Sequence, residues 1–66
     1  METEFLLYGL PAGESDQFKE QLLFSNGRSM NDIKKVAILA KNQGFHSFRT
    51  ATFSGGAPDF VSALNI

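Results

Sequence analysis

The absence of cysteine from a chain of only 66 residues most constrains what this sequence can fold into. Without cysteine no disulfide can form, and a single histidine leaves too few nitrogen and sulfur ligands for a structural zinc site in one chain. A chain of this length buries only about 60 % of its unfolded surface. One small apolar core must therefore hold the fold, and we expect a single domain over residues 1–66.

The composition allows such a core, since 42 % of the residues are hydrophobic and 20 % are charged, unlike a disordered chain. The start, Met1-Glu2-Thr3-Glu4, is acidic, whereas a secretory signal begins with basic residues. No apolar run approaches the ~20 residues that span a bilayer. We therefore expect a soluble cytoplasmic protein. Its size and lack of catalytic motifs are compatible with an accessory protein of a bacterium, plasmid or phage.

The first patterned segment is Thr3–Tyr8, which ends in four consecutive apolar residues, Phe5-Leu6-Leu7-Tyr8. Consecutive apolar positions are typical of a strand that is covered on both faces. The next segment, Gly9–Gly13, contains two glycines and a proline, which suit a turn. We predict a strand followed by a turn.

The segment Glu14–Phe24 has features of a helix. Glu14 and Asp16 would lie in its first turn, where the positive end of the helix dipole favours carboxylates. Phe18 and Leu22 are four residues apart and would share one face. A Ser-Asn-Gly sequence follows and suits a helix end. We therefore predict a first main helix here.

The strongest helical pattern covers Ser29–Gln43. Ser29 is a suitable N-cap, Asp32 stands where a capping box has its acidic partner, and Gly44 suits the position after the last turn. The apolar residues form one stripe at helical spacing: Met30, Ile33, Val36, Ala37 and Ala40. The opposite side is polar and carries Asn31, Lys34, Lys35, Lys41 and Asn42.

The segment Phe45–Phe53 is rich in phenylalanine and threonine and is predicted as a second strand. Its alternation places Phe48 on one face and Arg49, Ala51 and Phe53 on the other. The sequence Ser-Gly-Gly interrupts the strand, and the proline after it suits the first position of a short helix over Pro58–Leu64.

The expected fold is a small α/β (α+β) domain of the order β-α-α-β-α. Two main helices and a short C-terminal helix would pack on two strands. If each of the two helices between the strands crosses the domain once, the second strand runs opposite to the first, which favours an antiparallel pair. If the first helix only caps the domain, the strands would instead be parallel through a right-handed crossover.

Two strands form a poor sheet, and an uncovered edge is a template for pairing with another chain. Two copies joined edge to edge would form a four-stranded sheet in a two-fold homodimer. Ile38 is a second indication of self-association, because this apolar side chain lies on the lysine side of its helix. A single exposed isoleucine is ordinary, but together with lysine stems it would also suit a partner contact. The candidate partner-binding residues are Ile38, Lys34, Lys35 and Lys41.

The formal net charge of −1 hides an uneven distribution. Residues 1–24 carry five acidic side chains against Lys19, and residues 25–50 carry five basic side chains against Asp32. The two segments can attract each other within the fold or steer a charged partner. Nucleic acid is such a partner, although DNA-binding domains usually have a basic pI. The candidate nucleic-acid contacts are Arg28, Lys34, Lys35, Lys41 and Arg49.

The only histidine, His46, could act as a general base. No nearby nucleophile or carboxylate can be assigned to it from the sequence, so a structural or surface role is favoured. None of the serines lies in a nucleophile-elbow motif. An enzyme is therefore the third possibility, after a binding module and a nucleic-acid-binding regulator.

Metal and anion sites have weak support. Glu14, Asp16 and Glu20 could hold a metal ion, although Lys19 among them favours a solvated surface. The segment Ser54–Pro58 places glycines before a helix start, as anion sites do, but its proline lacks an N–H and Asp59 adds negative charge, so a simple turn is the favoured explanation.

These patterns favour a small non-enzymatic protein-interaction module that forms a homodimer. A small nucleic-acid-binding regulator that uses the basic helix is the alternative. In both cases we expect no catalytic residue, no cofactor and no metal.

Overall fold

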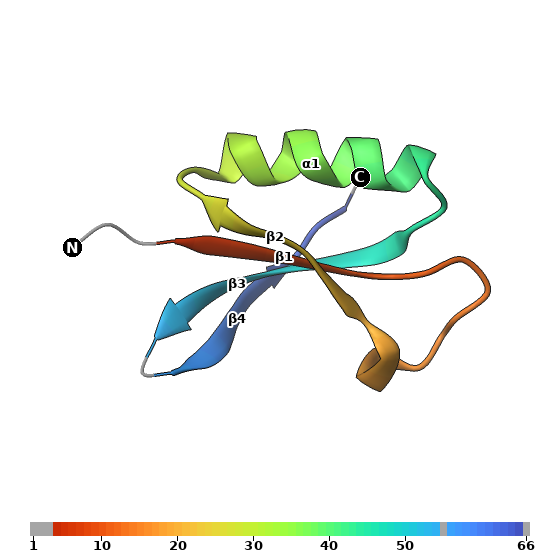
Figure 1. The fold of residues 1–66 in the computed structure, drawn as a ribbon, viewed down its shortest axis with the longest axis horizontal. Helices are drawn as coiled ribbons and strands as arrows, with labels where there is room; N and C mark the ends of the chain where they lie inside the picture. The colour runs from red at the N-terminus through yellow and green to blue at the C-terminus, as the bar shows by residue number, and fades with distance from the viewer. Residues whose placement is uncertain (1–3, 55, 66) are drawn as a thin grey trace.

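The computed structural model describes residues 4–54 and 56–65. The described chain forms β1 (Phe5–Leu10), the 3₁₀ helix η1 (Gln17–Lys19), β2 (Gln21–Gly27), α1 (Met30–Asn42), β3 (His46–Ser54) and β4 (Ala57–Ala63). The strands form one antiparallel sheet in the spatial order β2-β1-β3-β4. The helix α1 lies along one face of this sheet (Figure 1).

The predicted order β-α-α-β-α is wrong, because the described residues form four strands and one α-helix. The two predicted strands are present as β1 and β3 and pair antiparallel. Thr3, at the start of the first predicted strand, lies outside the described residues. All four strands belong to one copy, so a four-stranded sheet does not require the edge-to-edge dimer expected from the sequence.

The segment Glu14–Phe24, predicted as a helix, forms η1 and part of β2 instead. The Asp16 carboxylate accepts a hydrogen bond from the Phe18 backbone N–H, with 2.9 Å between the heavy atoms, but this cap begins only one 3₁₀ turn. At Glu20 the backbone is already extended, and the next residues pair with β1. A short apolar run does not distinguish a helix from a buried strand, and the pairing with β1 decides between them.

The segment Pro58–Leu64, predicted as a helix, forms most of the edge strand β4. Gly56, just before β4, has a φ of 84°, a conformation that glycine adopts without strain. The chain turns back there and pairs with β3 instead of starting a helix. Pro58 is tolerated because an edge strand can lack an N–H group.

The helix predicted over Ser29–Gln43 is confirmed as α1. Ser29 Oγ accepts a hydrogen bond from the Asp32 backbone N–H at 3.4 Å. The Asp32 carboxylate accepts one from the Arg28 backbone N–H at 3.2 Å. Gly44 follows the helix with a φ of 100°, the left-handed conformation that ends many helices. The local signals at both helix ends therefore act as the sequence indicates.

The core lies between α1 and the sheet, where Leu7, Ile33, Ala37 and Phe48 form its buried centre. The apolar stripe of α1 faces the sheet, as predicted. Because side chains alternate along a strand, the neighbours of Leu7 on β1 and of Phe48 on β3 point to the opposite face. Among the described residues no α-helix covers that second face (Figure 1).

Gly9 allows the core to close around β1. A Cβ atom added at Gly9 would lie 2.9 Å from Leu23 Cδ1 and 2.9 Å from Phe48 Cδ1, closer than carbon atoms pack. Overpacking of this kind costs about 1–3 kcal/mol. We therefore expect Gly9→Ala to lower the free energy of unfolding by about that amount, as measured by urea denaturation. An unchanged unfolding midpoint would show that the core has room at this position.

Candidate interaction surfaces

The sheet face opposite α1 is apolar, and we call it the open face. Directly paired residues of neighbouring strands share a face, and the pairs Leu6–Ala51, Tyr8–Arg49 and Ala51–Phe60 connect three strands across it. Tyr8 also pairs with Leu22 of β2. The open face is therefore formed by Leu6, Tyr8, Leu22, Arg49, Ala51, Phe53 and Phe60.

Three large apolar side chains of the open face are substantially exposed: Leu22 by 51 %, Phe53 by 57 % and Phe60 by 40 %. A shallow depression of about 290 Å³, which we call the open-face hollow, includes Leu22 and Phe53 in its lining. Its lining consists of Glu4, Leu6, Tyr8, Leu22, Ser25, Asn26 and Phe53. The open face thus offers both apolar area and a recess.

The helix η1 lies on the side of the sheet away from α1 (Figure 1). It carries Phe18, whose side chain is 98 % exposed. Glu20, at the end of η1, reaches Arg49 of the open face. An exposed aromatic side chain is therefore carried on the same side of the sheet as the open face. The sequence does not reveal this, because a helix over Glu14–Phe24 would place Phe18 on one face with Leu22.

The Glu20 and Arg49 side chains of this side of the sheet are paired with each other. Arg49 Nε donates to Glu20 Oε2 at 3.0 Å, and Arg49 Nη2 donates to Glu20 Oε1, so the ion pair is bidentate. The hydrogen bond to Glu20 raises the pKa of Arg49 above its ordinary value. Arg49 Cζ also lies 3.8 Å from the ring centre of Phe60, and the Phe60 ring is tilted against the Tyr8 ring, with 5.3 Å between the ring centres. The pair joins the acidic and basic segments and adds no net charge to the open face.

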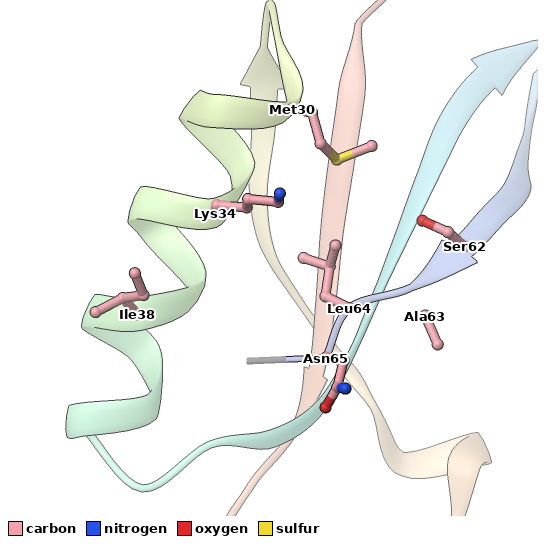
Figure 2. A pocket seen from close by; sticks show the side chains of 7 residues that line it. All are labelled: Met30, Lys34, Ile38, Ser62, Ala63, Leu64 and Asn65. Atoms are coloured by element: carbon pink, nitrogen blue, oxygen red, sulfur yellow. The ribbon is translucent and has the colours of Figure 1, made fainter.

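A second surface lies between α1 and the end of β4, and we call it the α1–β4 groove (Figure 2). Its volume is about 430 Å³. From α1 come Met30, Lys34 and Ile38, and from the other wall come Ser62, Ala63, Leu64 and Asn65. Figure 2 shows Lys34 extending from α1 over the groove. Lys34 forms no ion pair with another described residue.

The residues predicted to bind a partner are partly brought together. Lys34 and Ile38 line the α1–β4 groove, and Ile38 is 50 % exposed. Lys41 lines an adjoining hollow of about 260 Å³, which shares Leu64 with the groove. Lys35 is exposed but lines none of these three depressions. Two of the four predicted residues therefore belong to one surface.

The basic residues considered for nucleic-acid binding do not form one surface. Arg28 precedes α1, and Lys34, Lys35 and Lys41 lie on it. Arg49 lies on the opposite side of the sheet, where Glu20 and the Phe60 ring already engage its guanidinium group. A nucleic-acid surface on this protein would therefore use α1 without Arg49.

His46 connects two segments of the chain. Its Nε2 lies 2.8 Å from the Glu14 backbone oxygen, and its Nδ1 lies 3.0 Å from Ser47 Oγ. Because the carbonyl oxygen can only accept, Nε2 carries the proton in the neutral ring and Nδ1 accepts from the Ser47 hydroxyl. This contact ties the segment before η1 to the start of β3. The sequence did not reveal it because Glu14 lies 32 residues away.

The three carboxylates considered for a metal site have other partners. Glu14 forms an ion pair with Lys19 at 3.7 Å, Asp16 caps η1, and Glu20 binds Arg49. Among residues 4–54 and 56–65, no three His, Asp or Glu side chains gather into a possible metal site. These carboxylates therefore act within the fold.

The anion site considered at Ser54–Pro58 depended on a helix that begins at Pro58. Gly55 lies outside the described residues, and the chain after it forms β4. The helix dipole that would attract an anion is therefore missing at Pro58.

No family model matches this chain, and no curated protein or solved structure shows significant similarity to it. Within the described part of the chain, none of the helices has the length and apolar character needed to cross a membrane. Function is therefore inferred from the open face and the α1–β4 groove.

Proposed function

We propose that the protein is a small protein-interaction module that forms a two-fold homodimer through its open face. Phe18 carries the proposal, because it is 98 % exposed beside an uncovered apolar sheet face. Full burial of a phenylalanine side chain contributes about 1.5–3 kcal/mol. A single copy gains almost none of this free energy, whereas a dimer gains it twice. The proposal includes the cytoplasmic location and the non-enzymatic role expected from the sequence.

Two features of the open face suit a two-fold dimer. The helix η1, which carries the exposed Phe18, lies on the same side of the sheet (Figure 1), and the open-face hollow of about 290 Å³ can accept one aromatic ring. In a two-fold dimer every contact is made twice, so Phe18 of each copy can enter the hollow of the other. This dimer differs from the edge-to-edge arrangement expected from the sequence, because it buries sheet faces and not strand edges.

The size of the open face matches a small dimer interface. The open face points away from α1, so the longest and shortest extents of the molecule, 37 and 16 Å, give it a footprint of about 590 Å² (Figure 1). Two such faces together bury about 1,200 Å², the lower end of the range for specific protein interfaces. Two sheets packed face to face would lie about 10 Å apart, with a helix on each outer surface.

The charges of the open face favour a second copy over a charged partner. Glu20 and Arg49 already satisfy each other with two hydrogen bonds, so the pair can enter an interface without leaving an unpaired charge. The remainder of the open face is dominated by aromatic and aliphatic side chains, which are typical of interface centres. Apolar surface on both partners is what face-to-face self-association requires.

The nucleic-acid alternative depends on the lysines of α1, on the other side of the molecule. It predicts complexes with DNA or RNA at low salt that weaken steeply as the salt concentration rises. The double variant Lys34→Glu, Lys35→Glu should then abolish binding in a retardation assay while the fold is kept. Absence of a complex at low salt would remove this alternative.

A dilution series followed by ¹⁵N NMR tests the homodimer at the level of single residues. We expect the amide signals of Tyr8, Phe18 and Phe53 to shift as the protein is diluted from millimolar to low micromolar concentration. The signals of Lys35 and Leu39, on the outer side of α1, should stay constant. Concentration-independent spectra with a monomer's linewidths, or shifts confined to α1, would contradict an open-face dimer.

A further inference from the structure

We infer that the α1–β4 groove binds an extended, acidic segment of a partner protein, with apolar side chains on both sides of the acidic one. This site lies on the helix side of the sheet and is separate from the proposed dimer face. Its α1 wall presents an apolar, a cationic and an apolar side chain in succession: Met30, Lys34 and Ile38. Figure 2 shows Met30 and Lys34 extending from α1 toward the C-terminal segment, and Ile38 one turn further along the same helix.

The spacing of the three α1 residues matches an extended chain. Residues four apart in a helix are about 6 Å apart along its axis. Alternate residues of an extended segment point to the same side and are about 6.4–6.8 Å apart. Three alternate side chains of an extended segment can therefore meet Met30, Lys34 and Ile38 in turn. The matching pattern is apolar, acidic, apolar, with one residue between each.

The positive charge of Lys34 in the groove calls for an acidic residue at the centre of the bound segment. No acidic side chain lines the groove, and Lys34 has no ion pair among the described residues. The carboxylate nearest in sequence, Asp32, accepts a hydrogen bond from the Arg28 N–H at the start of α1. An ion pair formed by Lys34 between two apolar contacts is shielded from water, and it is therefore worth more than a fully exposed pair.

The opposite wall of the groove favours an extended segment over a helix. A helix satisfies its own backbone groups, whereas an extended segment brings N–H and C=O groups that need partners. Asn65 supplies an amide with no hydrogen bond to another described residue. Ser62 Oγ lies 2.9 Å from Thr50 Oγ1 and keeps capacity for one further hydrogen bond. The volume of about 430 Å³ lies within the range of binding sites for small ligands or a few side chains.

The test uses two fluorescein-labelled, end-blocked peptides, Val-Thr-Glu-Thr-Val and Val-Thr-Lys-Thr-Val, whose β-branched residues favour extended chains. Fluorescence anisotropy up to millimolar protein should detect binding of the glutamate peptide and a much weaker response with the lysine peptide. We expect Lys34→Gln to weaken binding at least about tenfold, as for a lost charge-assisted hydrogen bond. Lys35→Gln makes the same change on the same helix outside the groove and should change the affinity less than twofold.

Several outcomes would overturn the inference. Equal losses in Lys34→Gln and Lys35→Gln would indicate general attraction to a basic helix and not a groove. Equal binding of the two peptides would show that Lys34 does not select an acidic residue, and no binding of the glutamate peptide would show that the groove does not take such a segment. Tighter, salt-sensitive binding of a DNA duplex would indicate a nucleic-acid surface. Phe18→Ala should bind the peptide like the unchanged protein, so a failure of the dimer and a failure of the groove can be distinguished.

Discussion

Phe18→Ala should convert the protein from a dimer to a monomer at micromolar concentration. Each copy loses the burial of one phenylalanine side chain, about 1.5–3 kcal/mol, and a two-fold dimer loses it twice. The combined loss corresponds to a dissociation constant at least about 100-fold weaker. Sedimentation velocity across a concentration series of both proteins measures this change directly.

The choice of Phe18 separates association from folding, because a side chain that is 98 % exposed contributes little to the fold of one copy. Leu39→Ala is the matched control, since Leu39 is 65 % exposed on α1, away from the open face. It should leave the sedimentation of the protein unchanged. Phe53→Glu places a charge on the open face and should also give a monomer. If both Phe18→Ala and Phe53→Glu remained dimeric, the open face would not be the interface.

Ile33→Ala should remove a large part of the stability of the domain. Ile33 is fully buried between α1 and the sheet, and an ideal Cβ at Gly27 would lie only 2.6 Å from its Cδ1, so this end of the core is tightly filled. Truncation of a buried isoleucine to alanine costs about 2–5 kcal/mol. A domain of this size has a total stability of only about 3–10 kcal/mol. Urea denaturation followed by circular dichroism gives the free energy of unfolding.

Ile38→Ala is the control for this prediction. It makes the same chemical change on the same helix, but Ile38 is 50 % exposed in the α1–β4 groove. We expect it to cost less than about 1 kcal/mol, as usual for partly exposed positions. Equal losses in the two variants would show that α1 does not pack on the sheet through Ile33.

The sequence predicts α1 well because its signals are local. The cap at Ser29, the acidic residue at Asp32 and the glycine after the last turn all lie within or next to the helix they define. The identity of β2 and β4 depends on pairing with strands that are distant in sequence, and a short apolar run or a lone proline carries no information about such partners. The sequence therefore predicts helices over Glu14–Phe24 and Pro58–Leu64, whereas the first segment forms η1 with part of β2 and the second forms most of β4.

The candidate surfaces also divide into parts that local sequence patterns predict and parts that depend on the pairing of distant strands. Helical periodicity alone places Lys34 and Ile38 on one side of α1, and both line the groove. Strand alternation alone places Arg49 and Phe53 on the face opposite Phe48. The open face as a whole requires Leu22 and Phe60, which reach it only because β2 and β4 are strands. The Glu20–Arg49 ion pair likewise links two segments that the sequence describes only as opposite in charge.

Sedimentation equilibrium of the unchanged protein at micromolar concentration tests the central proposal most directly. The mass of one chain is 7.3 kDa, and an open-face homodimer predicts twice this value. The fitted mass should fall towards that of one chain only on strong dilution. A mass of 7.3 kDa throughout the micromolar range would contradict the homodimer.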